Sequence, residues 1–235
     1  MILVVGVTIL SGLATAQEPG GKPPRRPGGS PDWVPGGGSR MFSSTPLPKS
    51  EREKSMLAVL EDMDRNQRRG SMSVPMNDGR ILRVLVESTG AKNVVEIGTS
   101  IGYSAIWFCL GLEKTGGRLT TFEIDEGRAA KARENFKRAG VEKLVTLVMG
   151  DAHEQVKQLK DPIDILFLDA DKQGYLDYLT KLLPLVEPGG LVIAHNVTAR
   201  QADPRYVKAI TSNPELETLF LNLESSGIGV TMKKR

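Results

Sequence analysis

The sequence predicts an α/β protein built on a doubly wound, mostly parallel sheet, with helices on both faces and a C-terminal antiparallel hairpin. From residue 93 onward, short apolar runs alternate with longer stretches of helical periodicity, as in strands connected by crossover helices. Two runs, ILFLD and LVIAH, are apolar without interruption, which is typical of parallel strands covered on both faces. The last two runs, ETLFLNL and IGVTMKK, are separated by a short polar segment with a glycine, which predicts the hairpin.

Local signals place the individual elements. Ser50 and Glu53 fit a capping box, and Met56, Leu60 and Met63 follow at helical spacing, so a first helix is expected from residue 50. A second helix is expected over 81–86. Strands are expected at 93–97, 118–123, 144–149, 163–168 and 191–195, and helices near 103–114, 125–139, 153–160, 173–186 and 203–211.

The folded domain is expected to span residues 50–235. Two segments of different composition precede it in the sequence. Residues 1–17 are apolar, too short to cross a bilayer comfortably, and end near Ala14-Thr15-Ala16, a cleavage site of the A-x-A type. They predict a signal peptide, so no stable membrane span is expected after processing, although no Lys or Arg precedes the apolar run. Residues 18–49 contain eight Pro and seven Gly, which predicts a disordered linker.

Charge and cysteine content exclude some classes of function. The small basic surplus of the chain lies in residues 1–49, and residues 50–235 carry 26 charged side chains of each sign. A neutral domain argues against a nucleic-acid surface. The single cysteine, Cys109, lies in the apolar stretch AIWFCLGL, which predicts a buried, inert thiol and excludes a disulfide within one chain.

The stretch VVEIGTSIGYSAI raises the first functional question. Gly98 and Gly102 form a G-x-x-x-G pattern at the end of a predicted strand, where a dinucleotide-binding loop needs G-x-G-x-x-G to hold a pyrophosphate. Glu96 ends the strand instead, which suits a ligand with an ammonium group, and bare backbone at Gly98 lets a bulky ligand lie close. S-adenosylmethionine is such a ligand. The alternative is a tight turn beside a solvated glutamate.

Two further strands also end near acidic residues. Glu123 follows Gly98 by 25 positions, close to the offset at which a carboxylate meets ribose hydroxyls in nucleotide-binding α/β folds. Asp151 follows the third predicted strand, where it could accept a hydrogen bond from an adenine amine or simply cap a helix. Acids at three strand ends indicate a nucleoside-like ligand at this edge of the sheet.

At this point the chain resembles a known family. The segments SMSVPMNDGRIL, VVEIGTSIGYSAI, TTFEID, MGDAHE, DILFLDADKQGY and GGLVIAHNV are similar to the cation-dependent O-methyltransferases, which include the catechol and caffeoyl-CoA O-methyltransferases. The resemblance covers essentially all of residues 50–235 and implies a Rossmann-like methyltransferase sheet. It implies that S-adenosylmethionine is contacted by Val74, Glu96, Gly98, Thr99, Ser104, Glu123, Asp151, Ala152 and Asp169, with Glu96 on the methionine amine and Glu123 on the ribose.

The resemblance also assigns chemistry to the fourth strand. Methyl transfer to a hydroxyl requires that the hydroxyl be ionised and aligned, and a divalent cation can do both. In DILFLDADKQGY, Asp169 corresponds to the first metal ligand of the family and Lys172 to its general base. The alternative makes Asp169 and Asp171 helix caps and Lys172 a surface charge.

The fifth strand departs from the family pattern. Where the family has Asp-Asn, this chain has His195-Asn196. A metal site of Asp169, His195 and Asn196 would favour Mn, Fe, Co or Zn over Mg, because imidazole is a good transition-metal ligand. Two other interpretations stay open: His195 is a general base in a metal-free site, or the site is degenerate and the protein only binds the cofactor. His153 is expected to be structural or exposed.

The acceptor and the cellular location are less closely specified. A vicinal dihydroxyaromatic is expected, since two adjacent oxygens can chelate one metal, and the family often forms dimers. A nucleotide-dependent oxidoreductase is a third hypothesis, against which the missing G-x-G-x-x-G argues. Residues 1–17 predict an exported or periplasmic protein, whereas S-adenosylmethionine is made in the cytoplasm, the alternative location.

Overall fold

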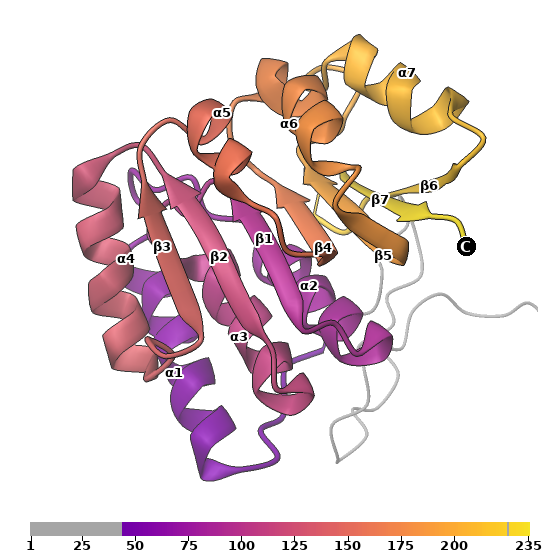
Figure 1. Cartoon of the computed structure of the whole chain (residues 1–235). Helices are drawn as coiled ribbons and strands as arrows, with labels where there is room; N and C mark the ends of the chain where they lie inside the picture. The colour runs from indigo at the N-terminus through magenta and orange to yellow at the C-terminus, as the bar shows by residue number, and fades with distance from the viewer. Residues whose placement is uncertain (1–43, 225) are drawn as a thin grey trace, which may run out of the picture. The chain divides into compact units, whose positions relative to one another are not determined.

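The computed structural model describes residues 44–224 and 226–235, and Figure 1 shows their arrangement. The predicted signal peptide, residues 1–17, lies outside the described residues, as does the predicted linker up to residue 43. Residues 44–50 contain no helix or strand, and residues Pro46–Arg235 form a compact unit by themselves. No described helix is long and apolar enough to cross a membrane.

The described residues contain one seven-stranded sheet in the order β3-β2-β1-β4-β5-β7-β6. The strands are β1 (Asn93–Ile97), β2 (Arg118–Glu123), β3 (Val145–Met149), β4 (Ile163–Leu168), β5 (Val186–His195), β6 (Leu216–Leu221) and β7 (Ile228–Lys233). The first five strands pair in parallel, while β7 runs antiparallel to both β5 and β6. The predicted doubly wound sheet with its C-terminal hairpin is confirmed.

Helices cover both faces of the sheet (Figure 1). One face packs on α1 (Glu51–Asn66), α2 (Met76–Thr89), α3 (Tyr103–Thr115) and α4 (Glu126–Ala139). The other packs on α5 (Ala152–Gln155) and the 3₁₀ turn η1 (Val156–Gln158), the 3₁₀ turn η2 (Lys172–Gly174), α6 (Tyr175–Leu182) and α7 (Pro204–Ser212). The central strands are therefore apolar on both sides, and Cys109 is buried in α3 as predicted.

Several element boundaries differ from the prediction for identifiable reasons. The second helix begins after Pro75 and ends at Gly90, which adopts a left-handed conformation (φ 70°), so it is longer than the apolar core 81–86. The fifth strand begins at Val186 instead of 191, because Val186 pairs with Ile163 before a register shift. The expected helix at 153–160 divides into α5 and η1, and the one at 173–186 into η2 and the shorter α6.

Gly79 sets how closely α2 approaches α3. A Cβ atom at this position would overlap the indole ring of Trp107, which is 2% exposed. Gly79→Ala should therefore destabilise the protein by about 1–3 kcal/mol through overpacking, although alanine is the better helix former. Urea unfolding measures the change. Val84→Ala, at a position of the same helix that is 54% exposed, is the control and should change stability by less than about 0.5 kcal/mol. A Gly79→Ala protein as stable as the wild type would contradict this packing.

Candidate active site

A cavity of about 540 Å³ opens at the carboxyl ends of β1, β2 and β3 and extends to the end of β4. Parallel strands bring their carboxyl ends to one edge of the sheet, which is where ligands bind in open α/β folds. The lining includes five of the predicted cofactor residues, namely Gly98, Glu123, Asp151, Ala152 and Asp169.

The other four predicted cofactor residues, Val74, Glu96, Thr99 and Ser104, are not part of this lining. Glu96 is fully buried: its Oε1 accepts a hydrogen bond from Ser104 Oγ (2.5 Å) and its Oε2 from Thr121 Oγ1 (2.6 Å). Thr99 Oγ1 lies 2.6 Å from Thr121 Oγ1 and extends the network. The Glu96 carboxylate thus ties the first turn of α3 to β1 and β2, and its contact with a ligand amine stays a prediction.

Steric constraints explain why glycine occupies two positions of the β1–α3 loop. Gly98 has φ 103°, and a Cβ atom there would lie 2.5 Å from the backbone oxygen of Asp169. Gly102 has φ 87°, and its Cβ would lie 2.5 Å from the ring of Phe136. Both positions therefore favour glycine through backbone conformation and through close contact. Because Gly98 has no side chain, the backbone of Asp169 at the end of β4 can pack against it, and Gly98 also lines the cavity.

Glu123 is a prearranged acceptor at the end of β2. Its side chain is buried, and its Oε2 accepts a hydrogen bond from the backbone N–H of Ser100 (2.7 Å). Its Oε1 accepts from the N–H groups of Ile124 (3.0 Å) and Asp125 (2.9 Å). Three backbone donors fix the orientation of this carboxylate in the cavity wall, where it can also accept hydrogen bonds from ligand hydroxyls.

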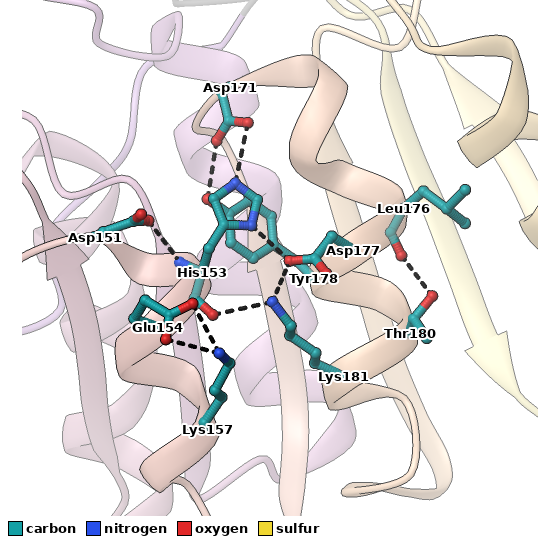
Figure 2. A network of polar contacts seen from close by, with 10 residues as sticks. All are labelled: Asp151, His153, Glu154, Lys157, Asp171, Leu176, Asp177, Tyr178, Thr180 and Lys181. Atoms are coloured by element: carbon teal, nitrogen blue, oxygen red, sulfur yellow. Dashed lines mark hydrogen bonds and ion pairs between the residues drawn. The ribbon is translucent and has the colours of Figure 1, made fainter.

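The end of β3 contributes a second polar cluster, which Figure 2 shows. Asp151 caps α5, since its Oδ1 accepts from the backbone N–H of His153 (2.9 Å). The His153 ring stacks on Tyr178 at 4.3 Å between centroids, and its Nδ1 lies 2.5 Å from Asp177 Oδ2. Burial opposes a charge on this ring, but hydrogen bonds with Asp177 and Asp171 outweigh it and raise the pKa of His153. His153 and Tyr178 both line the cavity, a role that no sequence motif indicated.

At the other end of the cavity, Lys172 is anchored beside Asp169. Its Nζ donates to Asp169 Oδ1 and to Tyr175 Oη, both at 2.9 Å. Tyr175 in turn donates to the backbone oxygen of His195 (3.1 Å), which joins the end of β4 to the end of β5. The predicted catalytic residues Asp169, Lys172 and His195 therefore lie together, although Asp169 follows β4, Lys172 begins η2 and His195 ends β5.

The His195 ring lies between two carboxylates. Its Nε2 is 2.9 Å from Asp78 Oδ2, and its Nδ1 is 3.3 Å from Asp169 Oδ1. Burial disfavours the charged ring, but the hydrogen bonds with Asp169 and Asp78 outweigh it and raise the pKa of His195 to about 9. Asp78 was not among the predicted site residues, because 117 positions separate it from His195 and no local pattern links them.

As arranged, Asp169, His195 and Asn196 do not fit a divalent metal ion. Metal ligands need lone pairs that converge on one point, whereas both ring nitrogens of His195 face carboxylate oxygens. The same Oδ1 of Asp169 already accepts from the Lys172 ammonium group. Among residues 44–224 and 226–235, no three His, Cys, Asp or Glu side chains are grouped as metal ligands.

The geometry can now be compared with known proteins. The sequence profile of the O-methyltransferase family matches residues 48–203. A catechol O-methyltransferase of Niastella koreensis is 41% identical over 131 residues, which cover 54% of this chain and 59% of the relative. A catechol O-methyltransferase of Mycobacterium tuberculosis is 35% identical over 127 residues, covering 54% of this chain and 57% of the relative. The chain thus spans less than two thirds of the length of these curated relatives.

Solved structures extend the likeness over more of the chain. The O-methyltransferase from Bacillus cereus, in complex with SAH, is 31% identical with a TM-score of 0.67, over 80% of this chain and 93% of that one. An O-methyltransferase from Streptomyces achromogenes, in complex with SAM, is 25% identical with a TM-score of 0.66, over 80% and 92% of the two chains.

The buried Glu96 should make stability depend on pH. Burial raises the pKa of Glu96 to about 8, against the hydrogen bonds from Ser104 and Thr121, from an ordinary value of 4.5. The folded protein therefore retains a proton that the unfolded chain releases, and this contribution to stability is complete below pH 4.5 and is lost as the pH rises to about 8. Each pKa unit corresponds to about 1.4 kcal/mol, so the total is on the order of a few kcal/mol.

Glu96→Gln should remove this dependence, because the amide resembles the protonated acid at every pH. Urea unfolding between pH 5 and pH 8 should show the wild type losing stability relative to the variant as the pH rises. Glu187→Gln changes an exposed carboxyl group and serves as the control. Parallel stability curves for wild type and Glu96→Gln would mean that Glu96 is ionised in the folded protein throughout.

Proposed function

Because the chain belongs to the O-methyltransferase family, we propose that it transfers the methyl group of S-adenosylmethionine to a hydroxyl of a small hydroxylated aromatic acceptor. The observation that carries this proposal is the cavity, which runs from the fixed carboxylate of Glu123 to Asp169. The names of the catechol O-methyltransferase relatives favour an acceptor with adjacent hydroxyl groups.

The cofactor end of the cavity fits a nucleoside. Glu123 presents a carboxylate whose orientation is set by three backbone N–H groups, so that it can accept from two ribose hydroxyls without rearrangement. The stacked pair of His153 and Tyr178 lies in the same wall and borders the space for a base. The cavity of about 540 Å³ has the size of a small-molecule site.

The chemical end of the cavity has to align a hydroxyl and remove its proton. When bound, S-adenosylmethionine would supply an activated methyl group: the acceptor oxygen would form a bond to the methyl carbon, the sulfur–carbon bond would break, S-adenosylhomocysteine would leave, and the hydroxyl proton would have to be taken up. Asp169 lines the cavity, and with Lys172 on its Oδ1 it can orient the acceptor hydroxyl. We assign the uptake of the proton to Lys172, whose Nζ is held in place by Asp169 and Tyr175.

Binding and turnover experiments test the proposal together. Titration calorimetry with S-adenosylmethionine, S-adenosylhomocysteine and NAD should give binding of the first two only. Methyl transfer should then be measured on a panel of catechols and monophenols. Binding without transfer to any acceptor would favour a non-catalytic cofactor-binding protein, and binding of NAD alone would favour an oxidoreductase.

Glu123→Ala should weaken the binding of S-adenosylhomocysteine by about 2 kcal/mol, through loss of the charge-assisted hydrogen bonds to the ribose. Calorimetry on the folded variant measures this. Glu126→Ala removes an exposed carboxylate three positions further on, outside the cavity lining, and should leave affinity unchanged. Wild-type affinity in Glu123→Ala would remove this residue from the site.

Lys172→Met should lower kcat by about 100-fold or more, because a positioned general base contributes at least that factor, while cofactor affinity stays constant. Rapid-quench assays at saturating cofactor measure the methyl-transfer step. Lys157→Met, which changes an exposed lysine on η1, is the matched control and should retain full activity. A Lys172→Met enzyme with wild-type kcat would exclude Lys172 as the proton acceptor.

A further inference from the structure

The two ring nitrogens of His195 are both in contact with carboxylate oxygens, at 2.9 Å from Asp78 and 3.3 Å from Asp169. A neutral imidazole has one N–H group, so one of these contacts would set a lone pair against a carboxylate. With both carboxyl groups ionised, both contacts are favourable only when the ring carries a proton on each nitrogen. The geometry by itself therefore describes a cation held between two anions.

Burial makes this arrangement specific. The side chains of Asp78 and His195 are 1% and 6% exposed, so their attraction is little weakened by water. Asp78 lies in the first turn of α2, where the helix dipole favours a negative charge. Its second oxygen, Oδ1, is buried and has no hydrogen-bond partner among the described residues. A buried carboxylate oxygen without a hydrogen-bond partner is costly in stability.

The charges at this edge of the sheet explain why a histidine is compatible with position 195. The resemblance to the cation-dependent O-methyltransferases implies an aspartate at the position of His195 and a divalent cation beside it. Exchanging an aspartate for a doubly protonated histidine adds two positive charges, which equals the charge of one divalent cation. When Lys172 is in its ammonium form, the cluster of Asp78, Asp169, Lys172 and a cationic His195 contains two anions and two cations, and its net charge is zero without a metal. Lys172 takes up the acceptor proton from its neutral amine form.

We propose that Asp78 is a positioning residue that fixes the His195 ring against Asp169, and that this ring supplies the positive charge that the resembling enzymes take from a divalent cation. The inference rests on the proposed function. Asp169 is the member of the cluster that lines the cavity, so His195 acts on the acceptor through Asp169, whose Oδ1 it shares with Lys172. The methyl-transfer site is then independent of metal ions.

Metal binding tests the proposal without any assay of activity. Titration of the full chain with millimolar Mn²⁺, followed by electron paramagnetic resonance, should show no stoichiometric binding to the wild type. His195→Asp restores the carboxylate and removes the positive charge, so this variant should acquire a Mn²⁺ site. Stoichiometric binding of Mn²⁺ by the wild type that is lost in His195→Ala would overturn the proposal.

The protonation of the ring can be observed directly. The chain contains two histidines, so ¹⁵N-histidine labelling gives a simple NMR spectrum, and His153→Gln assigns it. His195 should show protons on both ring nitrogens near neutral pH, and Asp78→Asn should lose the Nε2 proton signal. A wild-type His195 with one unprotonated nitrogen would contradict the proposal even if Asp78→Asn failed to fold.

Activity completes the test. Asp78→Asn should lower kcat at least about tenfold, as expected for a residue that orients the His195 ring without contacting the substrate. The affinity of this variant for S-adenosylhomocysteine should be unchanged, and a chelator should not affect the activity of the wild type. Glu53→Gln is the matched control. It removes a 2%-exposed carboxylate of α1 that forms an ion pair (2.6 Å) with Arg83, which lies in α2 as Asp78 does. Equal losses of kcat in Asp78→Asn and Glu53→Gln would mean that Asp78 has only a structural role. If no acceptor is methylated, the Mn²⁺ and NMR results still decide the proposal, and the proposed function fails separately.

Discussion

The arrangement of the candidate site depends on one close contact, in which the β1–α3 loop at Gly98 lies directly on the backbone of Asp169. A side chain at residue 98 would come within 2.5 Å of the Asp169 oxygen, so only a glycine permits this approach. The N–H of Asp169 also donates to the backbone oxygen of Ile97 at 2.9 Å, which fixes the end of β4 beside the end of β1. The distance between the cofactor end and the chemical end of the cavity follows from this contact.

The two buried carboxyl groups near this edge of the sheet, Glu96 and Asp78, have different partners. On the α3 side, Glu96 is surrounded by the hydroxyl groups of Ser104 and Thr121, and burial raises its pKa toward the neutral form. Near β5, Asp78 and His195 are equally buried, but each has a partner of opposite charge. A buried acid with neutral donors tends to keep its proton, whereas one beside a cation stays ionised. A buried carboxyl group therefore serves a structural purpose at Glu96 and an electrostatic one at Asp78.

The chain belongs to the O-methyltransferase family, although His195 departs from the pattern that the resemblance implies. Glu123 ends β2, His153 lies in α5 and Tyr178 lies in α6, and all three line the cavity. His195, the buried last residue of β5, is not part of this lining. In the mechanism that we propose, the positive charge beside Asp169 at the end of β5 comes from the His195 imidazolium.

The sequence by itself determined the fold class, the spans of β1, β2 and β4, and the position of Glu123 at a strand end, because apolar runs, glycine breaks and helix caps are local signals. It did not determine which way Glu96 points: a strand covered on both faces is apolar throughout, so no alternation marks its two sides. Nor did it reveal the partner of His195. Asp78 reaches that ring only because α2 packs closely on α3 at Gly79 and because β5 lies next to β4 in the sheet. Such contacts depend on the packing of elements far apart in the chain, and only the tertiary structure decides them.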